Sequence, residues 1–461
     1  MHELAGKRVT VMGLGLLGGG VGVTRFLVAE GAEVTATDLK DGSALAESLA
    51  KLAGLPVTFR LGGHVEGDFT EADLVVVNPA VPDGSPFVAK AREAGVPLTT
   101  EINLFFERCL APIVGVTGSN GKSTTVSLLA HLLEGGERRA WLGGNIGRSL
   151  LEDLDAIEPD DVVVLELSSF QLERLAWTGR SPSVAVVLNV SPNHLDRHGT
   201  LAAYAEAKQP ILAHQRPGDA ALLNADCPVA SAWGAVGEGR KRFFSVEREV
   251  ERGAWLEGGA GLWRDGGDRC TLFARSDLRL RGDHNVGNAL AAAGAAVLCG
   301  LPAQAVAPRL RSFGGLEHRL ELVRSLDGVG YYNDSKATTP EAAVAALKAF
   351  DEPVVLIAGG SDKKLSFEGL AREASARQVR GVVLLGAIAG QLRQAMAACG
   401  TVATHVVRDL AEAVAAAREL AEPGDVVLLS PGTASYDMFA NFEERGATFK
   451  RLVEELSPCC A

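Results

Sequence analysis

The chain reads Ile113-Val114-Gly115-Val116-Thr117-Gly118-Ser119-Asn120-Gly121-Lys122-Ser123 near the end of its first quarter, and this stretch decides how the middle of the protein folds. It starts as an apolar, β-branched run typical of a buried strand and continues as a helical pattern from Thr124 to Leu133. A glycine-rich turn between a strand and a helix directs consecutive backbone N–H groups, and the positive end of the helix, at an anion. The pattern therefore predicts a phosphate-binding loop in an α/β domain.

The residues of this loop have separate roles. Gly118 and Gly121 permit the tight backbone path, Lys122 would reach the terminal phosphates, and the hydroxyl of Ser123 would ligate Mg²⁺. The strict Walker pattern is not met, because Val116 stands where its first glycine is required. A chance glycine-rich turn is the alternative, and the strand before the turn and the helix after it argue against that alternative.

Strand and helix signals alternate on both sides of the loop, which is typical of parallel sheets covered by helices. We predict an α/β chain of three domains: a Rossmann-like N-terminal domain over residues 1–107, a central P-loop ATPase-like domain with a parallel sheet over 108–314, and a Rossmann-like C-terminal domain over 315–461. Glycine-broken segments over 239–282 predict hairpins at the edge of the central sheet. The stretch 313–316 contains two adjacent glycines, which indicate a linker. Strands are expected at 8–12, 33–38, 73–78, 161–167, 184–189, 329–332, 353–358, 381–385, 404–407 and 425–429.

Composition narrows the class of protein. The formal net charge of −12 over 461 residues disfavours nucleic-acid binding, because nucleic-acid-binding proteins present a basic face to phosphates. The seven cysteines are scattered without metal-ligand spacing, as in a reduced cytosolic protein. No apolar run reaches the roughly 18 residues of a membrane span, and the first residues lack a signal-peptide pattern. We expect a cytoplasmic monomer without a nucleic-acid partner or a membrane span.

Two side chains after central strands are candidate metal ligands. Glu166 interrupts an apolar run, where a buried charge needs a partner. A cation is the favoured partner, and an arginine across the sheet is the alternative. His194 follows the next strand, at the edge where parallel sheets bind ligands, although a lone histidine is often structural or solvated. Mg²⁺ prefers oxygen ligands, so His194 would contribute less than a carboxylate. By residue type alone, Lys208 in a helical segment is a solvated lysine.

The loop spelling Thr-Gly-x-Asn-Gly-Lys-Ser resembles the muramyl-peptide ligases and the related folylpolyglutamate synthases. Further stretches, in the same order along the whole chain, resemble the D-glutamate-adding members of the muramyl-peptide ligase family. They are Thr100 to Phe106, Gly144-Asn145-Ile146-Gly147, Leu165 to Glu173, Asn193 to Arg197, Asp283 to Asn288, Glu317-His318-Arg319, Asn333 to Thr338 and Leu429 to Gly446.

This resemblance implies an ATP-dependent, ADP-forming ligase that adds D-glutamate to UDP-N-acetylmuramoyl-L-alanine through an acyl phosphate, a step of peptidoglycan synthesis. It implies a catalytic set of Lys122, Glu166, His194 and Lys208, with Lys208 carbamylated and the last three joining Ser123 around Mg²⁺. ATP would contact Gly118, Ser119, Asn120, Gly121, Lys122, Ser123, Thr124, Asn285, Asn288, Arg319 and Asp334. The UDP substrate would contact Gly15, Leu16, Leu17, Asp38, Lys40, Asn78, Ala80, Asn145 and His194. D-glutamate would contact Lys336, Thr338, Lys363, Ser435 and Phe442.

Elementary chemistry agrees with two of these assignments. A neutral lysine amine can add CO₂, and the carbamate that results is an oxygen donor suited to a hard cation such as Mg²⁺. Glutamate has two carboxylates, and Lys336 and Lys363 offer point charges for them. Either lysine alone is an ordinary surface residue.

The first domain departs most from the family pattern. Leu17 stands where a small hydroxyl residue is common, and Asn78-Pro79-Ala80 replaces a usual Ser-Pro-Gly. Gly13-x-Gly15-x-x-Gly18 followed by Asp38 also matches a dinucleotide fingerprint, a weak motif when taken alone. Three alternatives to the ligase therefore stay open: another amide ligase of the same superfamily, a nucleotide-dependent switch, and an NAD-dependent dehydrogenase.

Overall fold

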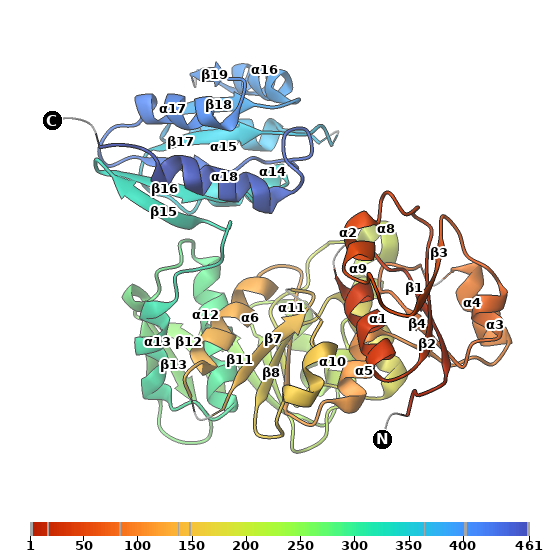
Figure 1. Cartoon of the computed structure of the whole chain (residues 1–461). Helices are drawn as coiled ribbons and strands as arrows, with labels where there is room; N and C mark the ends of the chain where they lie inside the picture. Colours follow the sequence, from red (N-terminus) through yellow and green to blue (C-terminus); the bar gives the residue numbers. More distant parts are fainter. Residues whose placement is uncertain are drawn as a thin grey trace. The chain divides into compact units, whose positions relative to one another are not determined.

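The structure is a computed structural model that describes residues 3–15, 18–82, 84–136, 138–146, 149–363, 365–400 and 403–458. Leu16 and Leu17 of the expected substrate loop lie outside the described residues. The chain forms two compact units. One comprises Met1–Asp277 with Val286–Leu310, and the other comprises Leu278–Asn285 with Arg311–Ala461. Three separate sheets carry the fold (Figure 1).

The first sheet has five strands in the order β3-β2-β1-β4-β5, all parallel. The chain passes from one side of β1 to the other between β3 and β4, so the carboxyl ends of β1 and β4 form a switch point, where such sheets bind ligands. The elements are β1 (Arg8–Met12), α1 (Gly19–Ala29), β2 (Glu33–Asp38), α2 (Ala46–Ala50), β3 (Val57–Leu61), α3 (Gly67–Thr70), β4 (Leu74–Val77), α4 (Pro86–Glu93), β5 (Leu98–Thr99) and α5 (Glu101–Arg108).

The central sheet has nine strands in the order β14-β13-β12-β11-β10-β9-β6-β8-β7. Strands β6 to β11 are parallel, and β12, β13 and β14 form the hairpins expected at the edge. The elements are β6 (Ile113–Thr117), α6 (Lys122–Leu133), β7 (Ala140–Gly144), β8 (Val162–Glu166), α7 (Ser169–Leu175), β9 (Val184–Val187), α8 (Leu195–His198), α9 (Leu201–Glu206), α10 (Pro210–Ala213), β10 (Ala220–Asn224), α11 (Pro228–Ala232), β11 (Arg240–Ser245), β12 (Gly253–Glu257), β13 (Ala260–Arg264), β14 (Cys270–Ala274), α12 (His284–Leu298) and α13 (Val306–Ser312).

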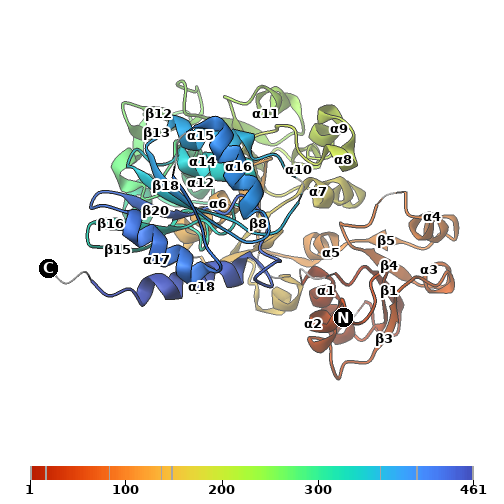
Figure 2. The ribbon, with the colours of Figure 1, turned by 90° about the horizontal axis from the view of Figure 1, so that it is seen from above.

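The third sheet has six strands in the order β15-β16-β20-β17-β18-β19, of which only β15 is antiparallel to its neighbour. Helices α14, α15 and α16 pack on one face, and α17 and α18 pack on the other (Figure 2). The elements are β15 (Glu321–Leu326), β16 (Val329–Asn333), α14 (Pro340–Leu347), β17 (Val354–Gly359), α15 (Glu368–Ala376), β18 (Val379–Leu385), α16 (Ala389–Cys399), β19 (Thr404–Val406), α17 (Leu410–Leu420), β20 (Val426–Leu429) and α18 (Phe442–Glu454).

The predicted α/β class and the three sheets are confirmed. Most strand boundaries differ from expectation by one or two residues, and two other boundaries also differ. Helix α6 begins at Lys122 rather than at Thr124, because Gly121 takes a left-handed conformation with φ 85° and ends the loop. The division between the two units falls after Leu310, a few residues before the expected linker.

The first two sheets share one hydrophobic core. Val11 and Phe26 of the first domain, and Val163 and Leu172 of the central domain, belong to the same cluster of buried side chains. Burial of this kind is the main favourable term in folding, so a continuous core makes the two domains one compact unit. In the described part of the chain, no helix has the length and apolar character needed to cross a membrane.

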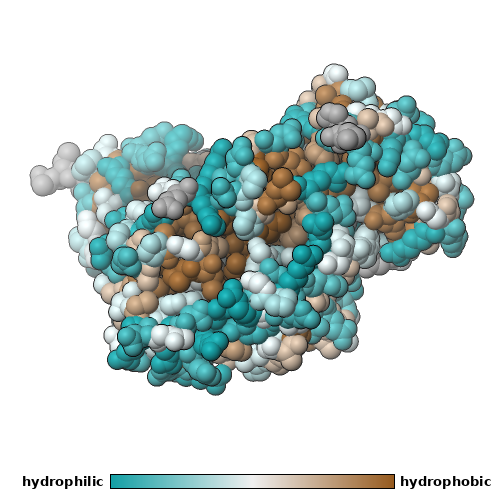
Figure 3. Space-filling model, turned by 90° about the horizontal axis from the view of Figure 1, so that it is seen from below, coloured by the Kyte–Doolittle hydropathy of each residue, from teal (hydrophilic) through white to brown (hydrophobic). Residues whose placement is uncertain are grey.

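Apolar side chains also reach the surface. On the face drawn in Figure 3, hydrophobic residues gather in areas that hydrophilic residues surround. The exposed large apolar side chains are distant in sequence and include Leu110, which is 78% exposed, and Tyr436, which is 73% exposed. Single exposed apolar residues are ordinary on the surfaces of folded proteins.

Candidate active site

The phosphate-binding loop lies at the carboxyl end of β6, between the neighbouring strands β8 and β9. Glu166 ends β8 and His194 follows β9, so the expected residues gather at one edge of the sheet. Within the described residues, no side chain caps the first turn of α6. The start of a helix directs backbone N–H groups at an anion, so this position suits a phosphate. Lys122 lies in this first turn, and its Nζ donates to the carbonyls of Gly118 (2.9 Å) and Ser119 (3.1 Å).

Lys208 is buried against this loop, contrary to what its residue type suggests. Only 1% of the residue is exposed, and its Nζ lies 3.3 Å from both Thr117 Oγ1 and the carbonyl oxygen of Gly118. Burial, reinforced by the positive charge of Lys122 and opposed by Glu166, lowers the pKa of Lys208 to about 7. A large fraction of this amine is therefore neutral, and hence nucleophilic, near neutral pH.

Glu166 is buried in the same region, with 3% of the residue exposed. Its Oε1 accepts a hydrogen bond from Asn145 Nδ2 at 3.0 Å, while its Oε2 has no hydrogen-bond partner among the described residues. The structure therefore gives no arginine partner for this carboxylate in the described part of the chain. A buried carboxylate oxygen without a donor is suited to a cation, so the residues present fit a bound Mg²⁺. The described residues contain no ready cluster of three or more His, Cys, Asp and Glu side chains, so protein ligands of these four types alone do not complete such a site.

His194 lies among aromatic rings beside the loop. It has a left-handed backbone with φ 52°, and its ring centroid is 5.1 Å from that of Phe170 and 6.4 Å from that of Tyr204. Tyr204 also contacts Lys208, whose Nζ is 4.6 Å from the ring centroid, and its hydroxyl accepts from Ser119 Oγ at 3.3 Å. Tyr204 therefore links the histidine, the buried lysine and the loop.

Asn288, an expected ATP contact on α12, borders the loop. Thr125 Oγ1 lies 3.4 Å from its Oδ1, and a Cβ on Gly121 would lie 2.3 Å from the same atom. A side chain at position 121 would therefore clash with Asn288, in addition to the strain of the positive φ.

The expected substrate loop of the first domain lies at its switch point. Asp38 Oδ2 accepts from the backbone N–H of Gly15 (3.0 Å) and Oδ1 from that of Lys40 (2.9 Å). Asn78 Nδ2 donates to the carbonyl of Gly13 (3.1 Å), and Asn78 Oδ1 accepts from Ala80 N (3.0 Å). The fold therefore brings together the residues of this domain that were predicted to contact the UDP substrate and that the structure describes.

Two arginines of the central domain hold the loop after β4. Arg174, with 1% of the residue exposed, donates to the carbonyls of Asn78 (2.6 Å) and Val81, and Arg197 donates to that of Pro79 (3.1 Å). Backbone carbonyls held in this way cannot shift without breaking charge-assisted hydrogen bonds. The loop after β4 is therefore fixed to the central domain.

In the second unit, the expected residues follow β16, β17 and β20, which are neighbours in the third sheet. Asp334 accepts from Leu320 N (3.2 Å) and Ser430 Oγ (2.9 Å), and burial raises its pKa to about 7. Lys336 Nζ lies 5.5 Å from the ring centroid of Phe442. The loop of Lys363 meets that of Ser435, because Ser361 N donates to Ala434 O at 2.8 Å.

The remaining expected residues of this unit make backbone or side-chain contacts of their own or lie at the surface. Thr338 N donates to Lys336 O at 2.9 Å, and Lys363 is exposed. Asn285, in the first turn of α12, belongs to the segment Leu278–Asn285 of this unit, and its Nδ2 donates to Arg281 O at 2.7 Å. Asp334, Lys336 and Lys363 lie in loops at one edge of the third sheet.

Arg445 has a structural role that we did not predict. Only 2% of the residue is exposed, and its guanidinium donates to Ser335 Oγ (2.9 Å), Ser335 O (2.8 Å) and Thr433 O (3.2 Å). Burial lowers its pKa to about 10. It therefore joins the loops that carry Lys336 and Ser435. The signal in the sequence is a basic residue in the first turns of a helix, where the dipole disfavours it unless it has a specific partner.

Comparisons with known proteins agree with this arrangement. Three family models match the chain: the Mur ligase MurD-like N-terminal domain at residues 7–100, the Mur ligase middle domain at 116–296, and the Mur ligase glutamate ligase domain at 318–432. A UDP-N-acetylmuramoylalanine–D-glutamate ligase from Roseiflexus sp. (strain RS-1) is 48% identical over 99% of this chain and all of its own length. The ligase of that name from Symbiobacterium thermophilum is 44% identical over 98% of both chains.

Solved structures show the same fold. The UDP-N-acetylmuramate–alanine ligase of Thermotoga maritima superposes with a TM-score of 0.62 at 20% identity, covering 97% of this chain and 99% of its own. The MurF ligase of Thermotoga maritima, solved in complex with ADP, superposes with a TM-score of 0.56 at 18% identity, covering 92% and 95%.

Proposed function

This chain belongs to the Mur ligase family, and from that premise we propose how its three domains divide the work. Residues 1–107 bind the UDP-sugar substrate, 108–314 bind ATP, and 315–461 bind the incoming amino acid. The chain is an ADP-forming ligase that adds D-glutamate to UDP-N-acetylmuramoyl-L-alanine in peptidoglycan precursor synthesis. Its near-full-length identity of 48% to a ligase of that name is the observation that carries this function.

The reaction must activate a carboxylate, which is a poor acyl donor. An oxygen of the alanyl carboxylate attacks the γ-phosphorus of ATP, which gives an acyl phosphate and releases ADP. The amine of D-glutamate then attacks the acyl carbon, phosphate leaves, and an amide forms as the amine loses a proton. Water would hydrolyse the acyl phosphate, so the reacting groups have to be shielded from solvent.

The central loop supplies the positive charge for phosphoryl transfer. Lys122 is already held in the first turn of α6, where donors converge on an anion. Bound Mg²⁺ would neutralise phosphate charge, held by Ser123, Glu166, His194 and a carbamate on Lys208. The lowered pKa of Lys208, together with the unpartnered Oε2 of Glu166, supports this arrangement.

The third domain presents cations to the two carboxylates of D-glutamate. Lys336 lies beside Phe442, and Lys363 lies in the loop that meets the loop of Ser435. We assign these four residues and Thr338 to the amino acid, and Asn285, Asn288, Arg319 and Asp334 to ATP.

The first domain holds the UDP moiety at its switch point. Asp38 and Asn78 order the loops after β1, β2 and β4, and Gly15, Lys40 and Ala80 belong to those loops. Asn145 lies against Glu166, which suits a contact with the part of the substrate nearest the phosphate. We propose that the chain acts as a monomer.

One assay tests this function. The purified chain is incubated with ATP and Mg²⁺, and phosphate release is measured with each substrate omitted in turn. Release should require both UDP-N-acetylmuramoyl-L-alanine and D-glutamate. Release that does not depend on D-glutamate, or that is stimulated by L-lysine, diaminopimelate or folate, would overturn the assignment.

A further inference from the structure

The turn that carries Arg319 has an unusual backbone. His318 (φ 62°) and Leu320 (φ 44°), on either side of Arg319, both adopt left-handed conformations without being glycine. Such conformations are strained for residues other than glycine and persist only when surrounding contacts impose them. The direction in which Arg319 points therefore depends on what holds its two neighbours.

Two carboxylates hold them. Glu321 Oε2 accepts from the backbone N–H of His318 at 2.9 Å, and Asp334 Oδ1 accepts from that of Leu320 at 3.2 Å. Asp334 follows β16 and is buried, whereas Glu321 begins β15 and keeps 18% of its side chain exposed. The His318 side of the turn therefore depends in part on the position of Glu321.

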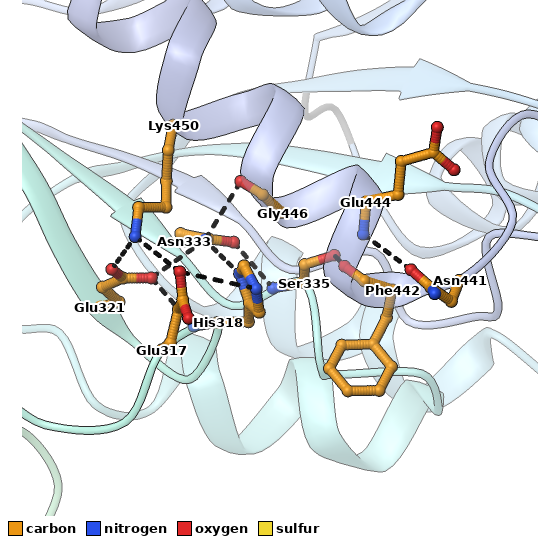
Figure 4. Close-up of polar contacts among 10 residues, drawn as sticks. All are labelled: Glu317, His318, Glu321, Asn333, Ser335, Asn441, Phe442, Glu444, Gly446 and Lys450. Carbon is orange, nitrogen blue, oxygen red and sulfur yellow. Dashed lines mark hydrogen bonds and ion pairs between the residues drawn. The ribbon is translucent and has the colours of Figure 1, made fainter. Parts of the chain in front are cut away.

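Lys450 fixes Glu321 in turn (Figure 4). Its Nζ donates to Glu321 Oε1 at 2.7 Å and to Glu317 Oε1 at 2.9 Å. Asn333 Nδ2 completes the set by donating to Glu321 Oε2 at 3.1 Å. Lys450 therefore holds the turn at two residues, Glu317 before His318 and Glu321 after Leu320.

Close packing at Gly446 places Lys450 on the side of α18 that faces the turn. A Cβ on Gly446 would lie 2.2 Å from His318 Nδ1, so the helix approaches the turn as near as a glycine allows. Residues four apart share one face of a helix, so Lys450 follows Gly446 on the face that meets the turn. Figure 4 shows both residues on that face of α18.

We propose that Lys450 is a positioning residue for ATP, which acts through Glu321 to hold the turn that presents Arg319. This inference rests on the proposed contact between Arg319 and ATP. An exposed ion pair would contribute little, but side-chain exposures of 26% for Lys450 and 18% for Glu321 place their pair in a partly desolvated site.

The test uses Lys450→Met, which keeps the aliphatic stem and removes the charge. We expect the Kd of the non-hydrolysable analogue AMP-PNP, measured by calorimetry, and the KM for ATP to rise about fivefold. Lys336 N donates to His318 O at 3.1 Å, so the KM for D-glutamate should also rise, but less, because Arg445 holds the loop of Lys336 independently. Lys450→Arg should restore the Kd.

Arg451→Met is the matched control. Arg451 is the next residue of α18 and also pairs with a carboxylate, Glu455, at 3.2 Å, but both side chains are about 60% exposed. It should leave the Kd and both KM values unchanged. Thermal unfolding of both variants separates loss of fold from loss of position. An unchanged Kd in a folded Lys450→Met protein, or an equal rise in Arg451→Met, would overturn the proposal.

A double-mutant cycle separates this inference from the proposed function. If Arg319→Ala alone weakens AMP-PNP binding, Lys450→Met should weaken it no further in that background, because the effect of Lys450 passes through Arg319. Additive losses would refute the role of Lys450. If Arg319→Ala has no effect on binding, the proposed contact of Arg319 with ATP fails instead.

Discussion

Two glycine loops of this molecule each follow a strand that has parallel neighbours on both sides and lead into a helix, yet they carry opposite charges. The loop after β6 is lined by Lys122 and backed by the buried Lys208. The loop after β1 is backed by Asp38, whose carboxylate already accepts the N–H of Gly15. The helices after both loops start from a glycine with left-handed φ, Gly121 and Gly18.

The difference shows that backbone shape alone does not specify a phosphate site. In the central loop, N–H groups and ammonium groups both face an incoming anion, which suits phosphoryl transfer. In the first loop, a carboxylate occupies one N–H group, and a carboxylate repels phosphate but can accept from the hydroxyl groups of a ribose. We therefore expect changes in the central loop to affect the rate of reaction, and changes in the first loop to affect substrate affinity.

Lys122→Ala should give the largest effect. Removing the ammonium group should lower kcat about 1,000-fold, because charge on the transferred phosphoryl group loses its stabilisation. Phosphate release measures this loss. Lys241→Ala is the matched control, since Lys241 Nζ also donates to two nearby carbonyls, those of Gly237 and Gly239, but lies on β11. Similar values of kcat for the two variants would contradict the proposed difference in charge between the two loops.

Lys208→Ala should lower kcat about 100-fold, because the carbamate is lost with the amine. Short carboxylic acids added to the assay should restore part of the activity by supplying the missing oxygen donor. Lys348→Ala, which removes a lysine that pairs with Glu373 near the surface, is the control. Its kcat should stay unchanged, and short carboxylic acids should have no effect on it. Full activity of Lys208→Ala without added acid would remove the carbamate from the proposal.

Asp38→Ala should raise the KM for UDP-N-acetylmuramoyl-L-alanine about tenfold and change kcat little, because an affinity contact is lost rather than a transition-state contact. Asp41→Ala provides the control, because Asp41 is exposed and accepts hydrogen bonds from the nearby Ser43 and Ala44. A fall in kcat at unchanged KM would show that the first loop takes part in the chemistry, and would break the comparison.

The pH dependence of stability gives a separate test of the burial of Lys208. The pKa of Lys208 is about 7 in the folded chain and near 10.4 when unfolded. Between these values the unfolded chain binds the extra proton, so this group makes stability rise with pH from about 7 to about 10. Urea unfolding in CO₂-free buffer at pH 7 and pH 9.5 should show a smaller rise for Lys208→Met than for the unchanged chain. An equal rise in the free energy of unfolding for the two proteins would show that Lys208 is solvated.

The sequence predicted the sheets and the loops because strand periodicity, glycines and charged residues are local signals. Five strands, β3, β5, β7, β10 and β15, were not predicted, and two of them show the physical reason. β10 (Ala220–Asn224) consists mainly of alanine and leucine, which favour helices, and is a strand because it pairs with both β9 and β11. β7 (Ala140–Gly144) ends in two glycines, which weaken a strand signal.

The site was predictable where residue type and place in a motif coincide, and not where long-range packing sets the environment. Nothing local in the sequence indicates that Lys208 is buried, because the atoms that surround it include Thr117 and Gly118, far earlier in the chain. The same holds for Arg174 and for Arg445, whose partners are carbonyls of distant loops. Such partners become known only from the fold.

The strand order of the central sheet also has a consequence for how the protein forms. Strand β6 pairs only with strands that come much later in the chain, in registers such as Ile113 with Val163 and Val114 with Val184. Contacts of such high sequence separation require closure of long loops and form slowly. The nucleotide loop is therefore acquired late in folding, and a chain released before β9 is made has the loop sequence without the pocket that holds it.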